Sequence, residues 1–447
     1  MKRNRKMERN ENMKRSRMMA GVLILMLVLT AGMMSLTGCG QQDSNGEGGN
    51  EGMGFFGKND GSDRDARVGM EVPEALEDVN DQIGRVSYRM FQQAMGKPAE
   101  EGTSAMVSPL SLLTCLSMAQ AGAEGNTKTE MEETFGFTSE SFASWLDGWY
   151  DSLTEEDETR MNVANSFWYR QGFQPEEAYL QLLEERFHGT AREAAFDDST
   201  VSEINRWCDE NTYGMIPRLI NQLDPDQQAL LLNAVAFEGK WQKAYEDDLV
   251  SEGETFVTED GTEQEAVMLY SREDVYLSGE HTTGFLKPYQ EGYSFAAFLP
   301  EEGMSVEDWL KETGEDEFTR MLQESEYAPV STVIPEFKSE YTAQNMKAVL
   351  QDMGIQSLFS AGDCDLSAMG KSEGGDSLYV SDVLHKTFIE LNREGTRAAA
   401  VTGLVMKATS MEPEKIYEVR LDRPFVYAIL DQGSMTPIFM GIVMNVE

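Results

Sequence analysis

The sequence has few basic residues, few histidines and few cysteines, and each shortage argues against a class of protein. Its 37 lysines and arginines stand against 78 aspartates and glutamates, a formal net charge of −41. Such a chain repels phosphate backbones, so we expect no nucleic-acid partner. The four cysteines show no metal-binding spacing and imply no disulfide framework. Because H-E-x-x-H, phosphate-loop and G-x-G-x-x-G motifs are also missing, we expect no metal and no cofactor.

The first residues have the pattern of an export signal. Lys14, Arg15 and Arg17 precede the apolar run MMAGVLILMLVLTAGMMSL, which leads into LTGC at residues 36–39. A cationic start, a short apolar core and small residues at a cut site are typical of a secretory signal. The LTGC tetrad resembles the bacterial lipobox, which implies cleavage before Cys39 and lipidation of its thiol. An uncleaved membrane anchor is the alternative, and both place the body outside the cytoplasm on a membrane tether.

The chain is expected to have three parts. Residues 1–38 are the predicted lipoprotein-type signal peptide. Residues 39–72 are rich in Gly, Asn, Asp, Glu and Ser, with almost nothing to bury, which predicts a flexible spacer or tether. Residues 73–447 contain no second linker of this kind. Although they exceed the usual size of one core, we expect them to form one globular domain, because 40% of the chain is hydrophobic.

The apolar patterns of this domain predict an α+β fold. SPLSLLTCLSMAQAGA, from Ser108, predicts a buried helix after a Ser-Pro start, and SEINRWCDENTYGMI an amphipathic helix that ends near Gly214. Aromatic and branched runs of strand length are VANSFWYR, QALLLNAVAF, YSFAAFLP, LYVSDVLHKTFIEL, FVYAIL and IFMGIVMNV. Helices dominate the first half and strands the second, without βαβ alternation. Large, mainly antiparallel sheets follow.

A hydrolase active site is a weak interpretation. GKSEG, residues 370–374, matches the G-x-S-x-G motif around Ser372. That motif works only between a strand and a helix, which hold the serine on a sharp turn. Here we expect a loop before the motif and a strand after it. His385 lies in an apolar strand, where a hydrogen-bonded structural histidine is the simpler interpretation.

Four blocks of the sequence together resemble the serpin family of protease inhibitors. They are VSPLSLLTCLSMAQAGAEGNTKTEM from Val107, LLNAVAFEGKWQKAY from Leu231, HKTFIELNREGTRAAAVT from His385 and DRPFVYAILDQGSMTPIFMGIVMNV from Asp422. The resemblance covers nearly all of residues 75–447. It implies the serpin fold, with three β-sheets, eight to nine helices and an exposed reactive-centre loop. It also implies inhibition of serine or cysteine proteases without catalytic residues.

In serpins the segment after the hinge is a loop that inserts into the central sheet after cleavage. Alternate residues of a strand face the core, and here the set that begins at Thr396 is small or apolar. That alternation is what a future strand requires. The hinge residues implied by the resemblance are Arg393, Glu394, Gly395, Thr396, Ala398, Ala399, Ala400 and Thr402. By the same match, Ser108, Ser111, Asn233 and His385 form a polar cluster under the opening strands, and Trp241 lies where insertion begins.

Family spacing places the scissile bond between Thr409 and Ser410. Thr409 suits an elastase- or subtilisin-like protease. Met406 or Lys407 is the alternative and suits a chymotrypsin- or trypsin-like enzyme. The expected partners are therefore extracellular serine proteases, met by a monomer held at the membrane through its lipid anchor.

The first hinge position departs from the family. Serpins usually carry a glutamate there, which pairs with a lysine on a neighbouring strand. This chain has Arg393, and the matching position in VIPEFKSEY is Glu336. We expect an ion pair of reversed polarity that holds the hinge shut; two unrelated surface charges are the alternative. A non-inhibitory serpin-fold surface binding protein is the alternative function, but the small residues at Thr396, Ala398 and Ala400 favour an inhibitor.

Overall fold

The structure is a computed structural model that describes residues 70–153, 159–224, 227–343, 345–372, 378–396 and 415–446. The chain divides into residues 1–62 and 63–447, and every described residue lies in the second unit. The predicted signal peptide, Cys39 and most of the predicted spacer lie outside the described residues. In the described part, no helix is both long and apolar enough to cross a membrane.

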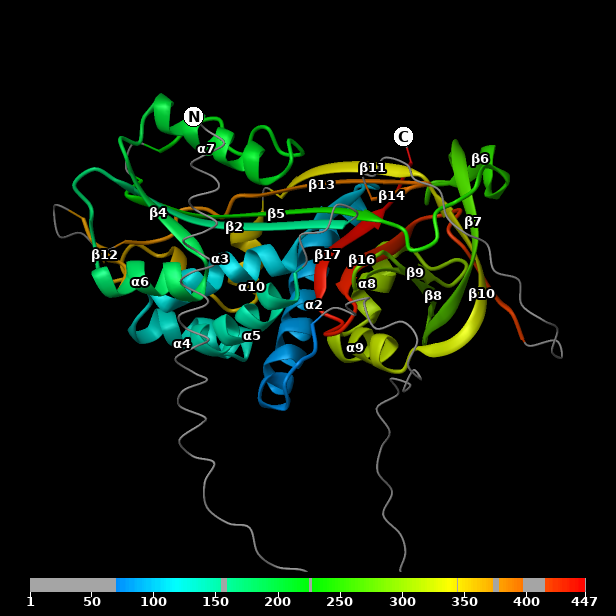
Figure 1. The fold of residues 1–447 in the computed structure, drawn as a ribbon, viewed down its shortest axis with the longest axis horizontal. Coiled ribbons are helices and arrows are strands. Elements are labelled where there is room, and N and C mark those ends of the chain that lie inside the picture. Colours follow the sequence, from blue (N-terminus) through cyan, green and yellow to red (C-terminus); the bar gives the residue numbers. More distant parts are fainter. Residues whose placement is uncertain are drawn as a thin grey trace, which may run out of the picture. The chain divides into compact units, whose positions relative to one another are not determined.

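Three β-sheets organise the described residues (Figure 1). The central sheet has the order β11 (Phe337–Ala343), β13 (His385–Asn392), β14 (Gly395–Thr396), β5 (Ala229–Lys240), β2 (Thr159–Arg170) and β4 (Gly189–Ala194). The nine-stranded sheet has the order β1 (Ala105–Val107), β17 (Pro437–Val443), β16 (Phe425–Asp431), β9 (Tyr293–Pro300), β8 (Thr282–Pro288), β7 (Glu263–Gly279), β10 (Glu326–Pro335) and β15 (Tyr417–Arg420), with β6 (Val250–Val257) on β7. β12 (Gly370–Lys371) and β3 (Gln174–Pro175) form the third.

Nine α-helices and three short 3-10 turns are present in the described residues. The helices are α2 (Glu77–Glu100), α3 (Pro109–Ala121), α4 (Gly125–Phe135), α5 (Ser139–Ser152), α6 (Glu177–Arg186), α7 (Asp198–Asn211), α8 (Val306–Glu312), α9 (Glu315–Gln323) and α10 (Met346–Asp352). The turns are η1 (Glu74–Leu76), η2 (Asp247–Leu249) and η3 (Ser357–Phe359). In Figure 1, α7 lies on one face of the central sheet, and α3 lies on the opposite face.

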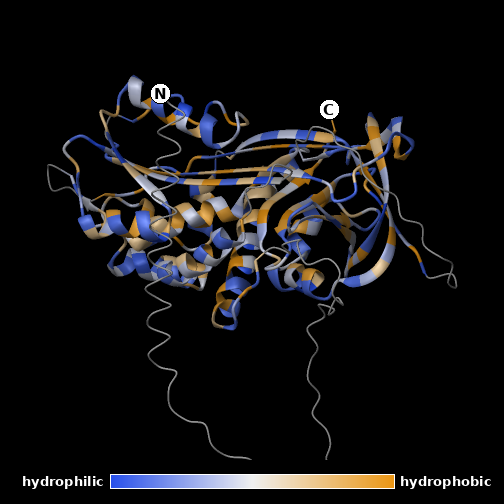
Figure 2. Ribbon diagram, viewed as in Figure 1, coloured by the Kyte–Doolittle hydropathy of each residue, from blue (hydrophilic) through white to orange (hydrophobic). Residues whose placement is uncertain are grey.

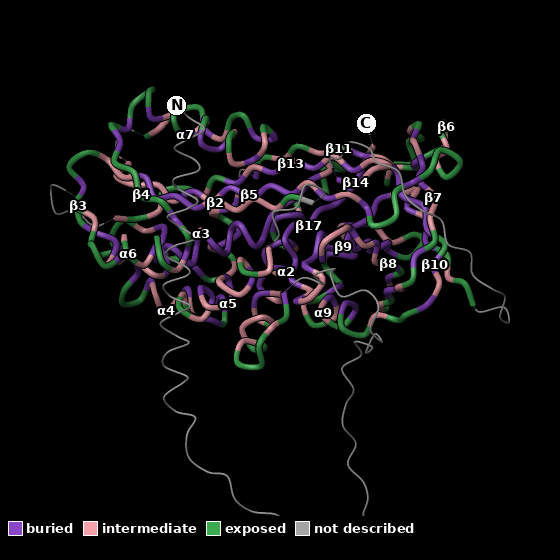
Figure 3. The backbone as a smooth tube through the Cα atoms, viewed as in Figure 1, coloured by how far each residue is buried: buried purple, intermediate pink, exposed green. Residues whose placement is uncertain are grey.

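Local sequence explains the elements nearest the site. The Ser108 side chain caps α3 by accepting the Ser111 N–H at 3.3 Å, and Pro109 supplies the preset backbone angle of the first turn. β9, β16 and β17 are buried along their whole length, so they form the centre of the core. Figure 2 shows apolar and polar residues alternating along many strands, and Figure 3 shows the buried segments gathered mainly in the middle of the molecule.

The α+β prediction is confirmed, and so is the implied fold of three sheets with eight to nine helices. One predicted strand was too long. Residues 378–384 of LYVSDVLHKTFIEL are not in a strand, and β13 begins at His385. The partner strand β11 ends at Ala343, opposite His385, so the residues before His385 have no neighbouring backbone to pair with among the described strands. An apolar sequence alone does not make a strand, because its N–H and C=O groups need partners.

Candidate functional site

The candidate site begins where β14 enters the central sheet. Gly395 pairs with Asn392 of β13 on one side and with Lys240 of β5 on the other, and Thr396 pairs with the adjacent residue of each strand. In the described ladders, β13 and β5 are joined only through these two residues. Beyond Thr396 the sheet therefore contains a gap between β5 and β13, which we call the slot.

A tight turn holds the start of β14. The Asn392 side-chain oxygen accepts the N–H groups of Glu394 at 2.9 Å and Gly395 at 3.2 Å. Gly395 has a φ of +156°, and a Cβ there would lie 2.0 Å from the Gly239 carbonyl oxygen. Only glycine fits so close an approach of two backbones. The predicted hinge residue Gly395 is thus a position where the backbone of β14 lies directly against that of β5.

Aromatic rings pack beneath this turn. The Trp241 indole stacks on the Tyr289 ring with 4.2 Å between centroids and 11° between planes. Its Nε1–H donates to the Asn392 carbonyl at 3.0 Å. The Tyr289 hydroxyl lies 2.6 Å from Thr396 Oγ1, so the buried hydroxyl of Thr396 has a partner. The sequence predicted Trp241 at this point and missed Tyr289, whose run of neighbours, KPYQEGYS, carries no distinguishing pattern.

Arg393 and Glu336 meet at the edge of the turn. Glu336 Oε1 accepts the Arg393 backbone N–H at 3.0 Å and lies 3.4 Å from its Nε. Asp247 Oδ1 lies 3.9 Å from an Nη of the same guanidinium. The Arg393 side chain is 37% exposed and that of Glu336 is 25% exposed, so water weakens the attraction. The structure brings together the two reversed charges.

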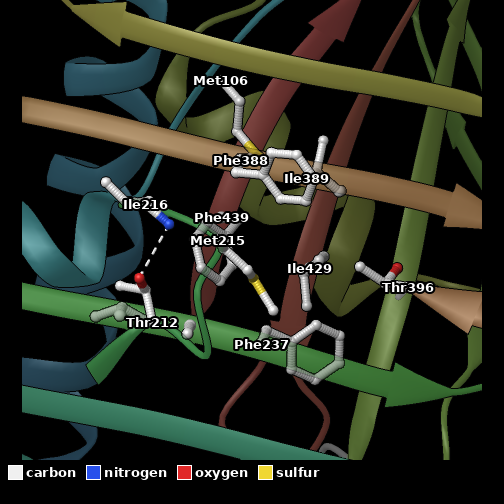
Figure 4. A pocket seen from close by; sticks show the side chains of 12 residues that line it. Met106, Thr212, Met215, Ile216, Phe237, Phe388, Ile389, Thr396, Ile429 and Phe439 are labelled. Atoms are coloured by element: carbon white, nitrogen blue, oxygen red, sulfur yellow. Dashed lines mark hydrogen bonds between the residues drawn. The ribbon is translucent and has the colours of Figure 1, made fainter. Parts of the chain in front are cut away.

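Next to Thr396 the slot opens into a small cavity of about 10 Å³. Phe237 of β5 and Ile389 of β13 line its sides. Met215 and Ile216, from the segment after α7, also line it, and Thr396 lies at one end (Figure 4). We call the end of the slot next to Thr396 its upper end. Apolar side chains fill this end closely.

A polar cluster lies further along the slot. The Ser108 N–H donates to His385 Nε2 at 2.9 Å, and the Ser111 hydroxyl is hydrogen-bonded to Asn233 Oδ1. The Asn233 side-chain amide donates to Asn165 Oδ1 at 2.6 Å. The structure thus gathers the four predicted residues and adds Asn165 of β2, which sequence reasoning missed. A polar side chain at a buried position of the apolar run VANSFWYR was the available signal.

The histidine of this cluster is neutral. Burial lowers the pKa of His385 to about 4. Its Nε2 accepts a hydrogen bond from Ser108, so that nitrogen carries no proton. A proton added at Nε2 would leave the buried Ser108 N–H without an acceptor, which couples the charge of His385 to the residue that caps α3.

The far end of the slot opens into a cavity of about 610 Å³. Its walls include Leu231 of β5, Leu112 of α3 and residues 378–384, which do not form a strand. Cys115 also lines it, and burial raises the pKa of its thiol to about 12, so it is a poor nucleophile. This end, which we call the lower end of the slot, contains a much larger cavity than the upper end.

Several predicted residues lie outside the described part of the chain. They are Ala398, Ala399, Ala400, Thr402, Met406, Lys407, Thr409 and Ser410. Ser372 is described and follows β12, so a two-residue strand, not a loop, precedes it. The strand expected after it is missing at residues 378–384. The described residues contain no group of three or more side chains suited to hold a metal ion.

In the described part of the central sheet, the two-residue strand β14 lies between β13 and β5 and pairs with both. Residues 81–446 match the family model described as Serpin (serine protease inhibitor). The chain belongs to the serpin family. Members of this family are mostly protease inhibitors and not catalytic enzymes.

Individual relatives support the same assignment. An uncharacterized serpin-like protein of Thermococcus kodakarensis is 29% identical over 376 residues, which is 81% of this chain and 84% of that protein. The crystal structure of the thermophilic serpin tengpin in its native state has a TM-score of 0.75 at 32% identity and covers 85% of this chain and 96% of its own. Thyroxine-binding globulin in complex with thyroxine shares the fold, with a TM-score of 0.70 at 20% identity over 82% of this chain and 99% of its own.

Proposed function

We propose that this serpin is a suicide-substrate inhibitor of extracellular serine proteases. The observation that carries the proposal is β14, a two-residue strand already paired on both sides at the mouth of an open slot. Residues that continue β14 would extend both ladders between β5 and β13. A loop cut after these residues would be free to enter the slot as a strand.

The register of β14 supports this proposal. Thr396 pairs with Gly239, and each further residue of an antiparallel strand advances one position back along β5. This rule places Thr402 opposite Asn233 and, on the other side, His385, so its hydroxyl would join the polar cluster. Leu404 would lie opposite Leu231, at the large cavity. The small side chains of the first residues after Thr396 would thus enter the closely filled end of the slot. The larger side chain of Leu404 would enter the end with the large cavity.

The length of the slot also fits the proposed scissile bond. β5 has 12 residues, and the segment that would pair with them is residues 395–406. Twelve residues of strand span roughly 40 Å. The bond between Thr409 and Ser410 would then lie just beyond the far end of β5. A protease attached to Thr409 would be carried across the whole sheet.

The proposed reaction uses the chemistry of the target protease. Its serine oxygen attacks the Thr409 carbonyl carbon, the peptide bond to Ser410 breaks, and the new amine of Ser410 takes the proton. The remaining ester links protease and inhibitor. Insertion must then distort the protease before water hydrolyses this ester. Until cleavage, the Arg393–Glu336 pair is proposed to hold the hinge, and a lipid on Cys39 to hold the exported protein at the membrane.

A gel tests the proposal. The protein is mixed with subtilisin, elastase or trypsin, and a complex that survives SDS is the expected product. Mass spectrometry over residues 405–412 identifies the bond, either the one after Thr409 or one of the alternatives after Met406 or Lys407. Loop cleavage by all three proteases without any complex would contradict the proposal.

A second candidate function is ligand binding without inhibition. The cavity of about 610 Å³ favours it, because ligand sites commonly have this size and an apolar lining. Thyroxine-binding globulin shows that a serpin fold can carry a small molecule, as its structure with thyroxine states. Clean cleavage on the gel, together with an apolar probe whose binding survives cleavage, would favour this function. Insertion of the loop would instead displace the probe.

A further inference from the structure

A buried ion pair lies on the far side of the aromatic rings that support the hinge. Lys287 of β8 and Glu273 of β7 are joined by 2.8 Å between Nζ and Oε1, and their side chains are 1% and 4% exposed. Burial lowers the pKa of Lys287, and the charge of Glu273 opposes this shift. Because desolvation offsets much of the attraction in such a pair, its contribution to overall stability is small. A role in fixing local structure explains its position better.

The Lys287 ammonium holds one short segment, residues 241–245, at three points. It lies 5.2 Å from the Trp241 ring centroid and 4.4 Å from the Tyr245 ring centroid, and it donates to the Lys243 carbonyl at 3.3 Å. Cation–π attraction is strongest where water is excluded, as it is here. Glu273 is itself fixed by a 2.6 Å hydrogen bond from the Ser271 hydroxyl.

The same segment holds the hinge turn. The Trp241 N–H donates to the Glu394 carbonyl and the Tyr245 N–H to the Arg393 carbonyl, each at 3.1 Å. The hinge turn has to stay in place while the loop folds over it into the slot, because it is the corner between β13 and β14. Contacts therefore run without a break from Lys287 through residues 241–245 to that corner.

We propose that Lys287, with Glu273 as its counter-ion, is a positioning residue for loop insertion: it keeps residues 241–245 seated against the hinge turn and so sets how fast the loop enters the sheet. The proposal rests on the function proposed above, and it assigns the pair a kinetic effect larger than its effect on stability. Neither residue touches the protease.

The test compares two paired variants. Lys287→Met with Glu273→Gln removes both buried charges without leaving one unpaired. Lys311→Met with Glu307→Gln makes the same chemical change at an exposed pair on α8. A trace of subtilisin cuts the loop of each protein, and the rise of the thermal midpoint with time gives the insertion rate. We expect insertion to be roughly tenfold slower in the first variant, the factor for one lost hydrogen bond to a charged group, and unchanged in the second.

Each outcome decides a different point. Equal insertion rates in the unmodified protein and in a correctly folded Lys287→Met, Glu273→Gln variant would overturn the role of Lys287 alone. An unmodified protein that gains no stability on cleavage would overturn the insertion mechanism and this proposal with it. If the variant does not fold, hydrogen exchange of the unmodified protein decides. The amides of Trp241, Tyr245, Glu394 and Gly395 should then exchange at one common rate, and rates that differ more than about tenfold would refute the coupling.

Discussion

The two ends of the slot differ in how completely they are built. At the upper end, Thr396 is buried and hydrogen-bonded to Tyr289, whose ring stacks on Trp241. At the lower end, the cavity of about 610 Å³ is open, and Tyr379 and Leu384 on its wall are 47% and 42% exposed. Pairing of free strand edges and burial of exposed apolar side chains both lower the free energy of a protein. An added strand would gain this stabilisation at the lower end. The difference shows where an added strand starts and what drives it onward.

A charge at the upper end should have the largest effect. We expect Thr396→Arg to abolish complex formation and leave a cleaved product. A guanidinium without a partner at this buried position costs about 3–5 kcal/mol, which would keep β14 out of the sheet. The measurement is the ratio of complex to cleaved protein on a gel. Arg397→Lys is the control, since alternation puts residue 397 on the other face. A Thr396→Arg variant that still traps protease would refute the hinge assignment.

Acid should weaken the middle of the slot. The pKa of His385 is about 4 in the folded protein against 6.5 for an ordinary histidine, so the unfolded chain binds the proton first as the pH falls. The stability linked to neutral His385 is complete above pH 6.5 and is lost towards pH 4, an effect of about 3 kcal/mol. Thermal midpoints measured over this range should fall less steeply in His385→Gln. Identical slopes in the unmodified protein and in His385→Gln would contradict the account.

Loss of Asn165 should have a smaller effect on the same cluster. Its amide donates to the Phe187 carbonyl at 2.6 Å and to the Tyr150 hydroxyl at 2.9 Å, and its oxygen accepts from Asn233. Asn165→Ala leaves these buried groups unpaired, so we expect about 1–3 kcal/mol of destabilisation in chemical unfolding. Asn126→Ala, at an exposed asparagine, is the control. Equal unfolding midpoints would show that Asn165 does not support the cluster.

The reversed ion pair at the hinge should have the smallest effect. Because Arg393 and Glu336 are partly exposed, we expect a coupling below about 1 kcal/mol in a double-mutant cycle on the insertion rate. The cycle uses Glu336→Gln, which keeps an oxygen that can accept the Arg393 backbone N–H, and Arg393→Gln. Each single change should alter the rate, and the double variant should show the coupling. Additive single effects would mean that the two charges are independent.

The sequence predicted the parts of the molecule that depend on local pattern. The apolar runs of β9, β16 and β17, and the Ser-Pro start of α3, are visible without any neighbours. Residues 378–384 have the same kind of pattern and still lack strand structure, because pairing depends on where β11 ends.

The candidate site was predictable to the extent that it follows the family pattern. The family pattern named Trp241, Arg393 and the four polar-cluster residues. The pairing of Lys287 with Glu273 was not predictable, because lysines and glutamates usually lie on the surface. Only the pairing of β7 with β8 brings these two charges together in the core. Asn165 was missed for a similar reason, because its partners come from other strands and helices.

The central claim is that residues 395–406 become a strand between β5 and β13. The most direct test is a crystal structure of the protein after cleavage of its loop. The account predicts a continuous ladder from β5 through the inserted segment to β13, with Thr402 between Asn233 and His385 and Leu404 in the large cavity. A cleaved protein in which β14 still ends at Thr396, or in which β5 pairs directly with β13, would contradict it.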